Sequence, residues 1–166
     1  MKDKTPLDRA FALDERGHQR RAFKVFLAAA RRGDANAFLT LGYAYETGRG
    51  TRPSKRKAVR WYKRALAAGD VSAAHNIGTV FRDRGNHVRA ARWFMRAIAM
   101  GHSGSNLELG QLLLRGNGQP TEALAAFRAV GGDESEATIE AARSWAVVVE
   151  GMLASSTERN GKRGAA

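Results

Sequence analysis

The sequence contains no cysteine and none of the patterns that usually mark a metal or membrane site. Without cysteine there is neither a disulfide framework nor a thiolate metal site. The four histidines, His18, His75, His87 and His102, are never three or four residues apart, so no pair has the helical spacing of a zinc site. We therefore expect no metal and no cofactor.

Long hydrophobic runs are also missing. No stretch of 18 apolar residues occurs, and the first 17 residues are charged throughout and lack the apolar segment of a signal peptide. We expect a cytoplasmic protein without a membrane segment. The 166 residues, 43% hydrophobic and 27% charged, are typical of a globular chain with a sizeable core.

Acidic residues are scarce, with 16 Asp or Glu against 28 Lys or Arg and a net charge of +12. The excess is confined to residues 1–100, which hold 22 basic and 8 acidic residues, whereas residues 101–166 hold 6 and 8. Such a field favours acidic partners. However, Arg exceeds Lys 21 to 7, a usage that a GC-rich coding sequence also produces, and basic runs on helices are most often a solvated face. The charge alone leaves both interpretations open.

What the sequence does contain is an internal repeat. The segment KAVRWYKRALAAG at 57–69 matches VRAARWFMRAIAMG at 88–101 with a constant offset of 32, which aligns Trp61 with Trp93 and Gly69 with Gly101. Weaker copies occupy 21–33 and 122–130. A second kind of segment precedes three of these copies, at 35–48, 72–85 and 105–116, and its apolar residues also have helical spacing. Two kinds of helix therefore alternate along the chain.

Glycines in these segments have two expected roles. Gly33, Gly69 and Gly101 follow the second helix of a pair, where a left-handed residue ends the helix. Gly42, by contrast, lies inside a helix, where glycine costs about 1 kcal/mol relative to alanine. Its recurrence as Gly78 and Gly110 indicates that paired helices approach closely there.

The most specific copy runs from Ala37 to Gly69. Its pattern Leu41-Gly42-xx-Tyr45-xx-Gly48-x-Gly50, then Lys57-Ala58-xx-Trp61-Tyr62-xx-Ala65-xxx-Gly69, resembles the SEL-one-like repeat, a relative of the tetratricopeptide repeat. The next two copies have 12 and 13 residues in place of the 16 between Gly42 and Ala58, and resemble ordinary tetratricopeptide repeats. The resemblance implies an all-α fold, a right-handed α-solenoid of antiparallel helix pairs.

The domain organisation follows from these segments. We expect a tail at 1–4, a repeat domain at 5–131 and a C-terminal capping helix at 132–154. The repeat domain would hold four helix pairs, at 5–33, 34–69, 70–101 and 102–131, and Thr5-Pro6-x-Asp8 predicts the cap of its first helix. Residues 155–166 lack apolar periodicity and are predicted to be a disordered tail.

The resemblance also implies a function, that of a non-enzymatic protein-interaction scaffold or adaptor. In such repeats the first helix of each pair lines a concave groove, which would bind a protein or peptide partner. No catalytic triad, phosphate-binding loop or functional acid pair is present in the sequence. The predicted groove residues are Leu39, Thr40, Tyr43, Glu46, His75, Asn76, Thr79, Arg82, Glu108 and Gln111.

The alternative is nucleic-acid binding through basic residues that recur in register on the second helices. A helical wheel places Tyr62 on the buried arc and Trp61 at its edge, which favours packing over base stacking, with the stems of Lys57 and Arg64 expected over Trp61. These residues would suit an acidic partner or phosphates. This basic ladder comprises Arg21, Lys24, Lys57, Arg60, Arg64, Arg89, Arg92 and Arg96, and it stops at Glu122, Ala125 and Ala129.

Overall fold

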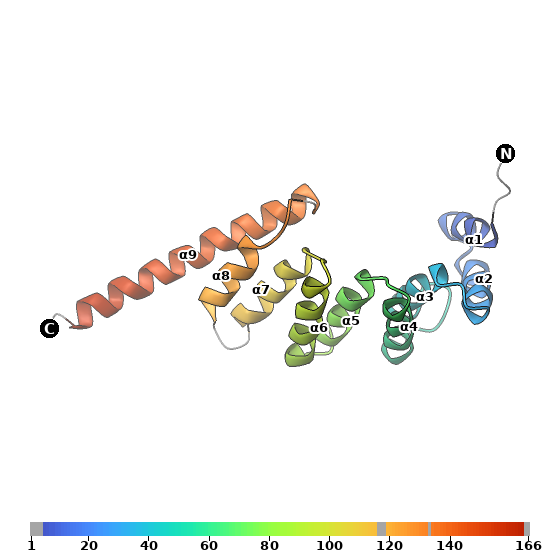
Figure 1. The fold of residues 1–166 in the computed structure, drawn as a ribbon, viewed down its shortest axis with the longest axis horizontal. Coiled ribbons are helices and arrows are strands. Elements are labelled where there is room, and N and C mark those ends of the chain that lie inside the picture. The colour runs from blue at the N-terminus through green and yellow to red at the C-terminus, as the bar shows by residue number, and fades with distance from the viewer. Residues whose placement is uncertain (1–4, 116–118, 133, 165–166) are drawn as a thin grey trace. The chain divides into compact units, whose positions relative to one another are not determined.

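A computed structural model describes residues 5–115, 119–132 and 134–164 of the chain; the predicted tail at 1–4 lies outside the described residues. These residues form nine α-helices and no strand, so the predicted all-α class is confirmed (Figure 1). The helices are α1 (Pro6–Glu15), α2 (Gln19–Arg31), α3 (Asn36–Thr47), α4 (Lys55–Ala67), α5 (Ser72–Arg82), α6 (His87–Ala99), α7 (Ser105–Arg115), α8 (Pro120–Arg128) and α9 (Glu136–Gly164).

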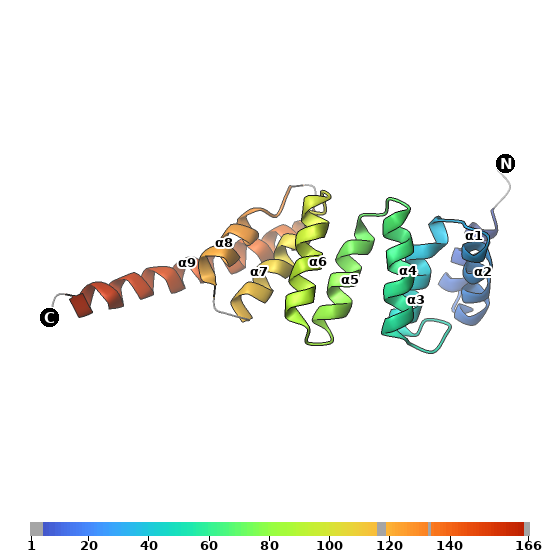
Figure 2. The same cartoon turned by 60° about the horizontal axis from the view of Figure 1, so that its bottom comes forward.

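The helices belong to two compact units, Met1–Arg84 and Gly85–Ala166. In the first unit, α1 packs on α2 and α3 on α4, while α2 contacts α3 and α4 contacts α5. Figure 2 shows α3 and α4 side by side, joined by the loop that contains Gly48 and Gly50. In the second unit, α6 contacts α7, α7 packs on α8, and α9 lies against both α7 and α8. Sequential antiparallel packing of helices therefore builds each unit.

Local signals in the sequence set the helix ends. Thr5 caps α1 through a capping box, in which its hydroxyl accepts from the Asp8 amide at 3.1 Å and its own amide donates to the Asp8 carboxylate at 2.8 Å. Gly33, Gly69 and Gly101 have φ values of 91°, 96° and 93°, a left-handed conformation that favours glycine. The predictions for both kinds of helix end are confirmed.

The core of the first unit depends on the close approach of α3 and α4. Tyr62 and Ala58 of α4 and Leu41 of α3 are fully buried. Gly42 faces the Tyr62 ring so closely that a Cβ at position 42 would overlap ring atoms Cδ1 and Cε1. In the second unit Gly110 faces Phe127 in the same way. The predicted packing role of these glycines is confirmed.

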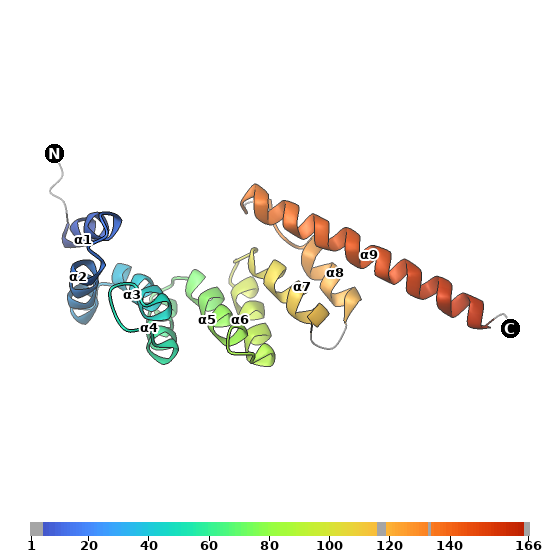
Figure 3. The same cartoon turned by 180° about the vertical axis from the view of Figure 1, so that it is seen from behind.

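Helix α9 covers the apolar surface of α7 and α8. Its Trp145 ring stacks on the Phe127 ring with centroids 5.9 Å apart, and Val149 is fully buried in a cluster with Ala123 and Leu124. Figure 3 shows α9 running along α8 and continuing toward the C-terminus. The last pair of helices is therefore covered at its end, as a capping helix would do.

The C-terminal segment differs from the expectation of a disordered tail beginning at residue 155. Helix α9 extends to Gly164, and the Ser155 hydroxyl donates to the Gly151 carbonyl at 2.8 Å. The segment contains no proline, and backbone hydrogen bonds of a helix need no apolar periodicity to form once a packed helix precedes them. Residues 165 and 166 lie outside the described residues.

Candidate functional site

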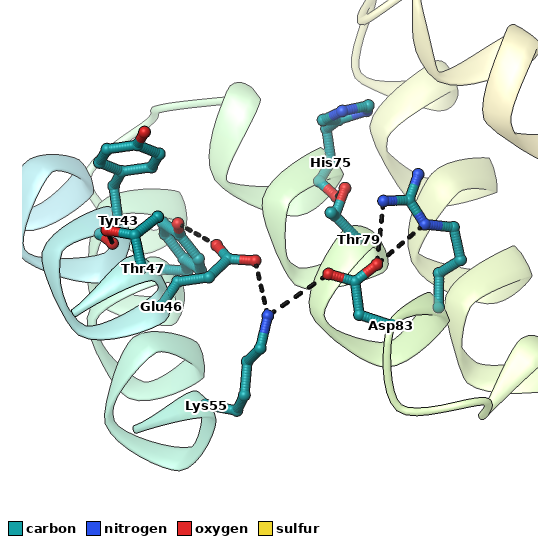
Figure 4. Close-up of polar contacts among 9 residues, drawn as sticks. Tyr43, Glu46, Thr47, Lys55, His75, Thr79 and Asp83 are labelled. Atoms are coloured by element: carbon teal, nitrogen blue, oxygen red, sulfur yellow. Dashed lines mark hydrogen bonds and ion pairs between the residues drawn. The ribbon is translucent and has the colours of Figure 1, made fainter. Parts of the chain in front are cut away.

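The predicted groove residues of the first unit lie on α3 and α5. Tyr43 of α3 is 51% exposed, whereas Leu39, Thr40, His75, Asn76 and Thr79 are half-buried. Figure 4 shows Tyr43 on α3 and His75 and Thr79 on α5, to either side of a chain of polar contacts. We call the surface formed by these six residues the α3–α5 face.

A chain of ion pairs joins the helices beneath this face. The Lys55 ammonium, at the start of α4, lies 3.3 Å from a Glu46 carboxylate oxygen on α3 and 3.4 Å from an Asp83 oxygen at the end of α5 (Figure 4). The Tyr62 hydroxyl donates to Glu46 at 2.6 Å, and Arg82 donates to Asp83 at 2.9 and 3.1 Å. One lysine thus connects all three helices.

Two groups of this network of ion pairs, Tyr62 and Asp83, do not titrate near neutral pH. Burial, and after it the hydrogen bond to the Glu46 carboxylate, raises the pKa of Tyr62 far above its ordinary value. Burial acts to raise the pKa of Asp83, but hydrogen bonds and charge from Arg82 and then Lys55 hold it below its ordinary value. Tyr62 therefore stays protonated, and Asp83 stays ionised at neutral pH.

Two predicted groove residues consequently have partners inside the first unit. Glu46, whose side chain is 13% exposed, accepts from Tyr62 and Lys55, and Arg82 binds Asp83. Of the two, Glu46 takes part in the contacts that join α3 to α4, whereas Arg82 pairs with its sequence neighbour. The remaining predicted groove residues, Glu108 and Gln111, are half-buried on α7 in the second unit. Eight of the ten predicted residues therefore lie in the first unit, and six of these make up the α3–α5 face.

The eight basic-ladder residues are exposed, on α2, α4 and α6. The expected contact of Arg64 with Trp61 is present, since its guanidinium lies 4.7 Å from that ring centroid and 4.6 Å from the Phe38 ring. The ammonium of Lys57 lies 5.1 Å from the Tyr45 ring of α3, a contact that the sequence did not indicate. Because the Tyr45 ring belongs to another helix, a helical wheel of α4 alone could not indicate this contact.

Part of this ladder lines a cavity of about 460 Å³ between α2 and α4, the basic pocket. Sequence reasoning missed Arg31, which follows Lys24 by seven residues on α2 and so lies on the same helix face. Arg21 and Lys24 do not line the cavity. The lining residues are Leu27, Arg31, Tyr45, Lys57, Arg60, Trp61 and Arg64.

The part of the chain that the structure describes offers neither a metal site nor a membrane span. No group of three or more His, Asp or Glu side chains is arranged to hold a metal ion there. None of the helices in that part is both long and apolar enough to cross a membrane.

Comparison with known proteins identifies the repeats. The Sel1 repeat family matches residues 40–70 and 72–102, and no curated protein matches the chain. The Sel1 repeat protein from Oxalobacter formigenes is 25% identical with a TM-score of 0.60, over 78% of this chain and 58% of that one. The protective antigen c5321 of uropathogenic Escherichia coli, which displays an SLR fold, is 22% identical with a TM-score of 0.63, over 82% of this chain and 32% of that one.

The chain thus spans less than two thirds of either solved structure. The repeat boundaries agree with the helices, because α4 lies wholly within 40–70, and α5 and α6 lie within 72–102. The chain therefore carries two Sel1 repeats and has the α-helical solenoid fold of Sel1-repeat proteins.

Proposed function

We propose that this protein is a non-enzymatic, cytoplasmic interaction scaffold or adaptor that binds a protein or peptide partner through the α3–α5 face. The observation that carries the proposal is the Tyr43 ring, 51% exposed on α3, in the same unit as the half-buried polar side chains of α5. Sel1 repeats, as a family, are typically protein-binding scaffolds, which supports the same function.

The composition of the face suits protein recognition. Tyrosine is enriched among the few residues that carry most of the energy of an interface, because its large ring loses little conformational entropy when it is buried. Asn76 and Thr79 place amide and hydroxyl groups on the same surface, and such groups can bond to a partner's backbone. We propose Tyr43 as the anchor and these polar groups as its surroundings.

The network beneath the face would prepare it for binding. Lys55 ties Glu46 to Asp83, and Tyr62 binds Glu46 from within the core. A surface already held in one arrangement loses less entropy on binding, which increases affinity. The groove candidate Glu46 thus contributes indirectly, by positioning α3 against α4, and Arg82 contributes by pairing with Asp83, which Lys55 binds.

Nucleic-acid binding is less well supported, because the two aromatic rings of α4 beside the ladder are packed within the first unit. Tyr62 is fully buried. The Trp61 ring lies 5.8 Å from Phe38, at 32°, with the Arg64 guanidinium 4.7 Å from its centroid. Single-stranded nucleic acid is bound through exposed aromatic faces. The packing of these rings therefore favours a protein partner.

Site-specific photo-crosslinking tests this proposal. A photoreactive amino acid would replace Tyr43 in one variant and Val88 in a control, since Val88 of α6 is 67% exposed and lies outside the face. After irradiation in cells of the native host, we expect a discrete protein adduct at position 43 and not at 88. Equal labelling at both positions, or adducts to nucleic acid alone at 43, would contradict the proposal.

A further inference from the structure

We propose that the basic pocket between α2 and α4 is a second binding site, specific for an acidic peptide segment of a partner protein. This inference does not depend on the α3–α5 face, because it rests on different residues. Arg31 of α2 and Lys57, Arg60 and Arg64 of α4 line the pocket, and all four are exposed. No acidic side chain is among the lining residues, so four positive charges surround one cavity of about 460 Å³.

These cations are not neutralised by the first unit. Within the described residues, no ion pair joins any of the four to a carboxylate, whereas Lys55, Arg49 and Arg82 of the same unit each have an acidic partner. Like charges gathered in one cavity repel one another and raise its positive potential. An anionic ligand would relieve this repulsion.

The second unit supplies an internal comparison. A cavity of about 590 Å³ lies between α6 and α8, and its lining includes all seven positions equivalent to those of the basic pocket. Equivalence follows from the repeat: positions in α2 and α3 shift by 68 residues, and those in α4 by 65. The counterparts of Leu27, Arg31, Tyr45, Lys57, Arg60, Trp61 and Arg64 are Met95, Ala99, Leu113, Glu122, Ala125, Ala126 and Ala129.

All four cations are therefore absent from the equivalent cavity, which has three alanines and one glutamate in their places. The helical repeat therefore forms a cavity at this position without any of the four cations. The fold thus does not require Arg31, Lys57, Arg60 or Arg64. Their presence in only one of the two equivalent cavities therefore has a reason other than folding. Binding of an anion supplies that reason.

Aromatic rings hold two of the cations at the pocket wall. The Arg64 guanidinium lies against the Phe38 and Trp61 rings, and the Lys57 ammonium lies 5.1 Å from the Tyr45 ring. Contacts of this kind restrict long side chains without neutralising their charge. The donors are therefore positioned before a ligand arrives.

Peptide carboxylates fit this pocket better than a nucleic-acid strand does. Three of the four cations are arginines, whose planar guanidinium binds a carboxylate through two parallel hydrogen bonds. A strand would need a row of phosphate contacts and free aromatic faces. Here the charges converge on one cavity, the ladder residues Arg21 and Lys24 lie outside its lining, and the Tyr45 and Trp61 rings each already contact a cation of the protein.

The test compares two variants of the full chain with the same net charge. Arg31→Gln/Arg60→Gln removes two pocket charges that make no ring contact or ion pair within the described residues, and Arg21→Gln/Lys24→Gln removes two ladder charges outside the pocket. The probe is a fluorescent hexaglutamate peptide, followed by anisotropy, with hexaglutamine as the uncharged control. Circular dichroism would establish that both variants keep the native helicity.

We expect the pocket variant to bind hexaglutamate about tenfold or more weakly than the wild type, and the ladder variant to stay within about twofold. Equal weakening in the two variants would overturn the proposal, since it would assign binding to the overall charge. It would also be overturned if hexaglutamate did not bind, or if an oligonucleotide of equal charge bound more tightly and depended on the pocket residues. None of these results depends on Tyr43, so this proposal and the proposed function can fail separately.

Discussion

Replacing Gly42 with alanine should destabilise the first unit, although alanine is the better helix former. A Cβ at this position would lie 3.0 Å from Cγ of Tyr62 and closer still to Cδ1 and Cε1. The ring has no free space to move into, because Tyr62 is fully buried and its hydroxyl donates to Glu46 at 2.6 Å. Relief of the overlap must therefore displace either the ring or the helix.

The magnitude follows from three contributions. Helix propensity favours alanine by about 1 kcal/mol. Overpacking costs about 1 to 3 kcal/mol, and loss of the hydrogen bond to the ionised Glu46 costs about 1.5 to 3 kcal/mol. The net loss is about 2 kcal/mol or more, which would lower the melting temperature of a unit of this size by roughly 10 °C.

Urea denaturation followed by the fluorescence of Trp61 measures this change. The other two tryptophans, Trp93 and Trp145, belong to the second unit, so a background with phenylalanine at both positions isolates the signal. In a further Tyr62→Leu background, Gly42→Ala should become neutral or stabilising, because the clash is removed. A wild-type free energy of unfolding for Gly42→Ala, or the same loss in both backgrounds, would refute the packing argument.

Three further predictions concern the network and the C-terminal helix. The raised pKa of Tyr62 keeps its hydroxyl protonated in the folded chain, so the free energy of unfolding should be constant below about pH 10 and fall above it by about 1.4 kcal/mol per pH unit. Urea titrations from pH 9 to 11.5 should show a smaller decrease per pH unit for Tyr62→Phe than for the wild type. Equal decreases in the two proteins would contradict this prediction. The lowered pKa of Asp83 contributes stability above about pH 4 that is lost in acid. Because the Arg82–Asp83 pair is partly exposed, Asp83→Asn should cost less than about 1 kcal/mol at pH 7 and nothing near pH 2. A difference in unfolding free energy between the variant and the wild type that does not change with pH would argue against the ion pairs. Deleting residues 133–166 should expose Phe127 and Leu124 and cause aggregation in light scattering; a monomeric truncation with unchanged helicity per residue would show that α9 is not a cap.

The fold could be predicted in detail where short-range chemistry sets it. Gly69 and its counterparts end helices because only glycine readily adopts a left-handed conformation there. A glycine is found at position 42, inside a helix, because the Tyr62 ring occupies the space that a side chain would need. Both causes leave a periodic mark in the sequence, and so the repeat, its helices and its close contacts were recognisable before the structure.

The site was less predictable, because its contacts join residues with no common period. Lys55 bridges Glu46 and Asp83 across three helices, and nothing in the spacing of these residues indicates that they meet. The stem of Lys57 was expected over Trp61 on its own helix, and nothing in that pattern indicates that the ammonium lies over the Tyr45 ring of α3. Arg31 completes a pocket whose other charges lie on α4, and only the packing of α2 on that side reveals it.

The dissociation constant of the crosslinked partner, measured for Tyr43→Ala and for Val88→Ala, tests the central claim most directly. Both changes remove an exposed apolar side chain, 51% and 67% exposed, but only the first lies on the α3–α5 face. If that face binds the partner through Tyr43, Tyr43→Ala should raise the dissociation constant about 30-fold, or about 2 kcal/mol, and Val88→Ala should leave it nearly unchanged. An unchanged constant for Tyr43→Ala in a chain of native helicity would contradict the account.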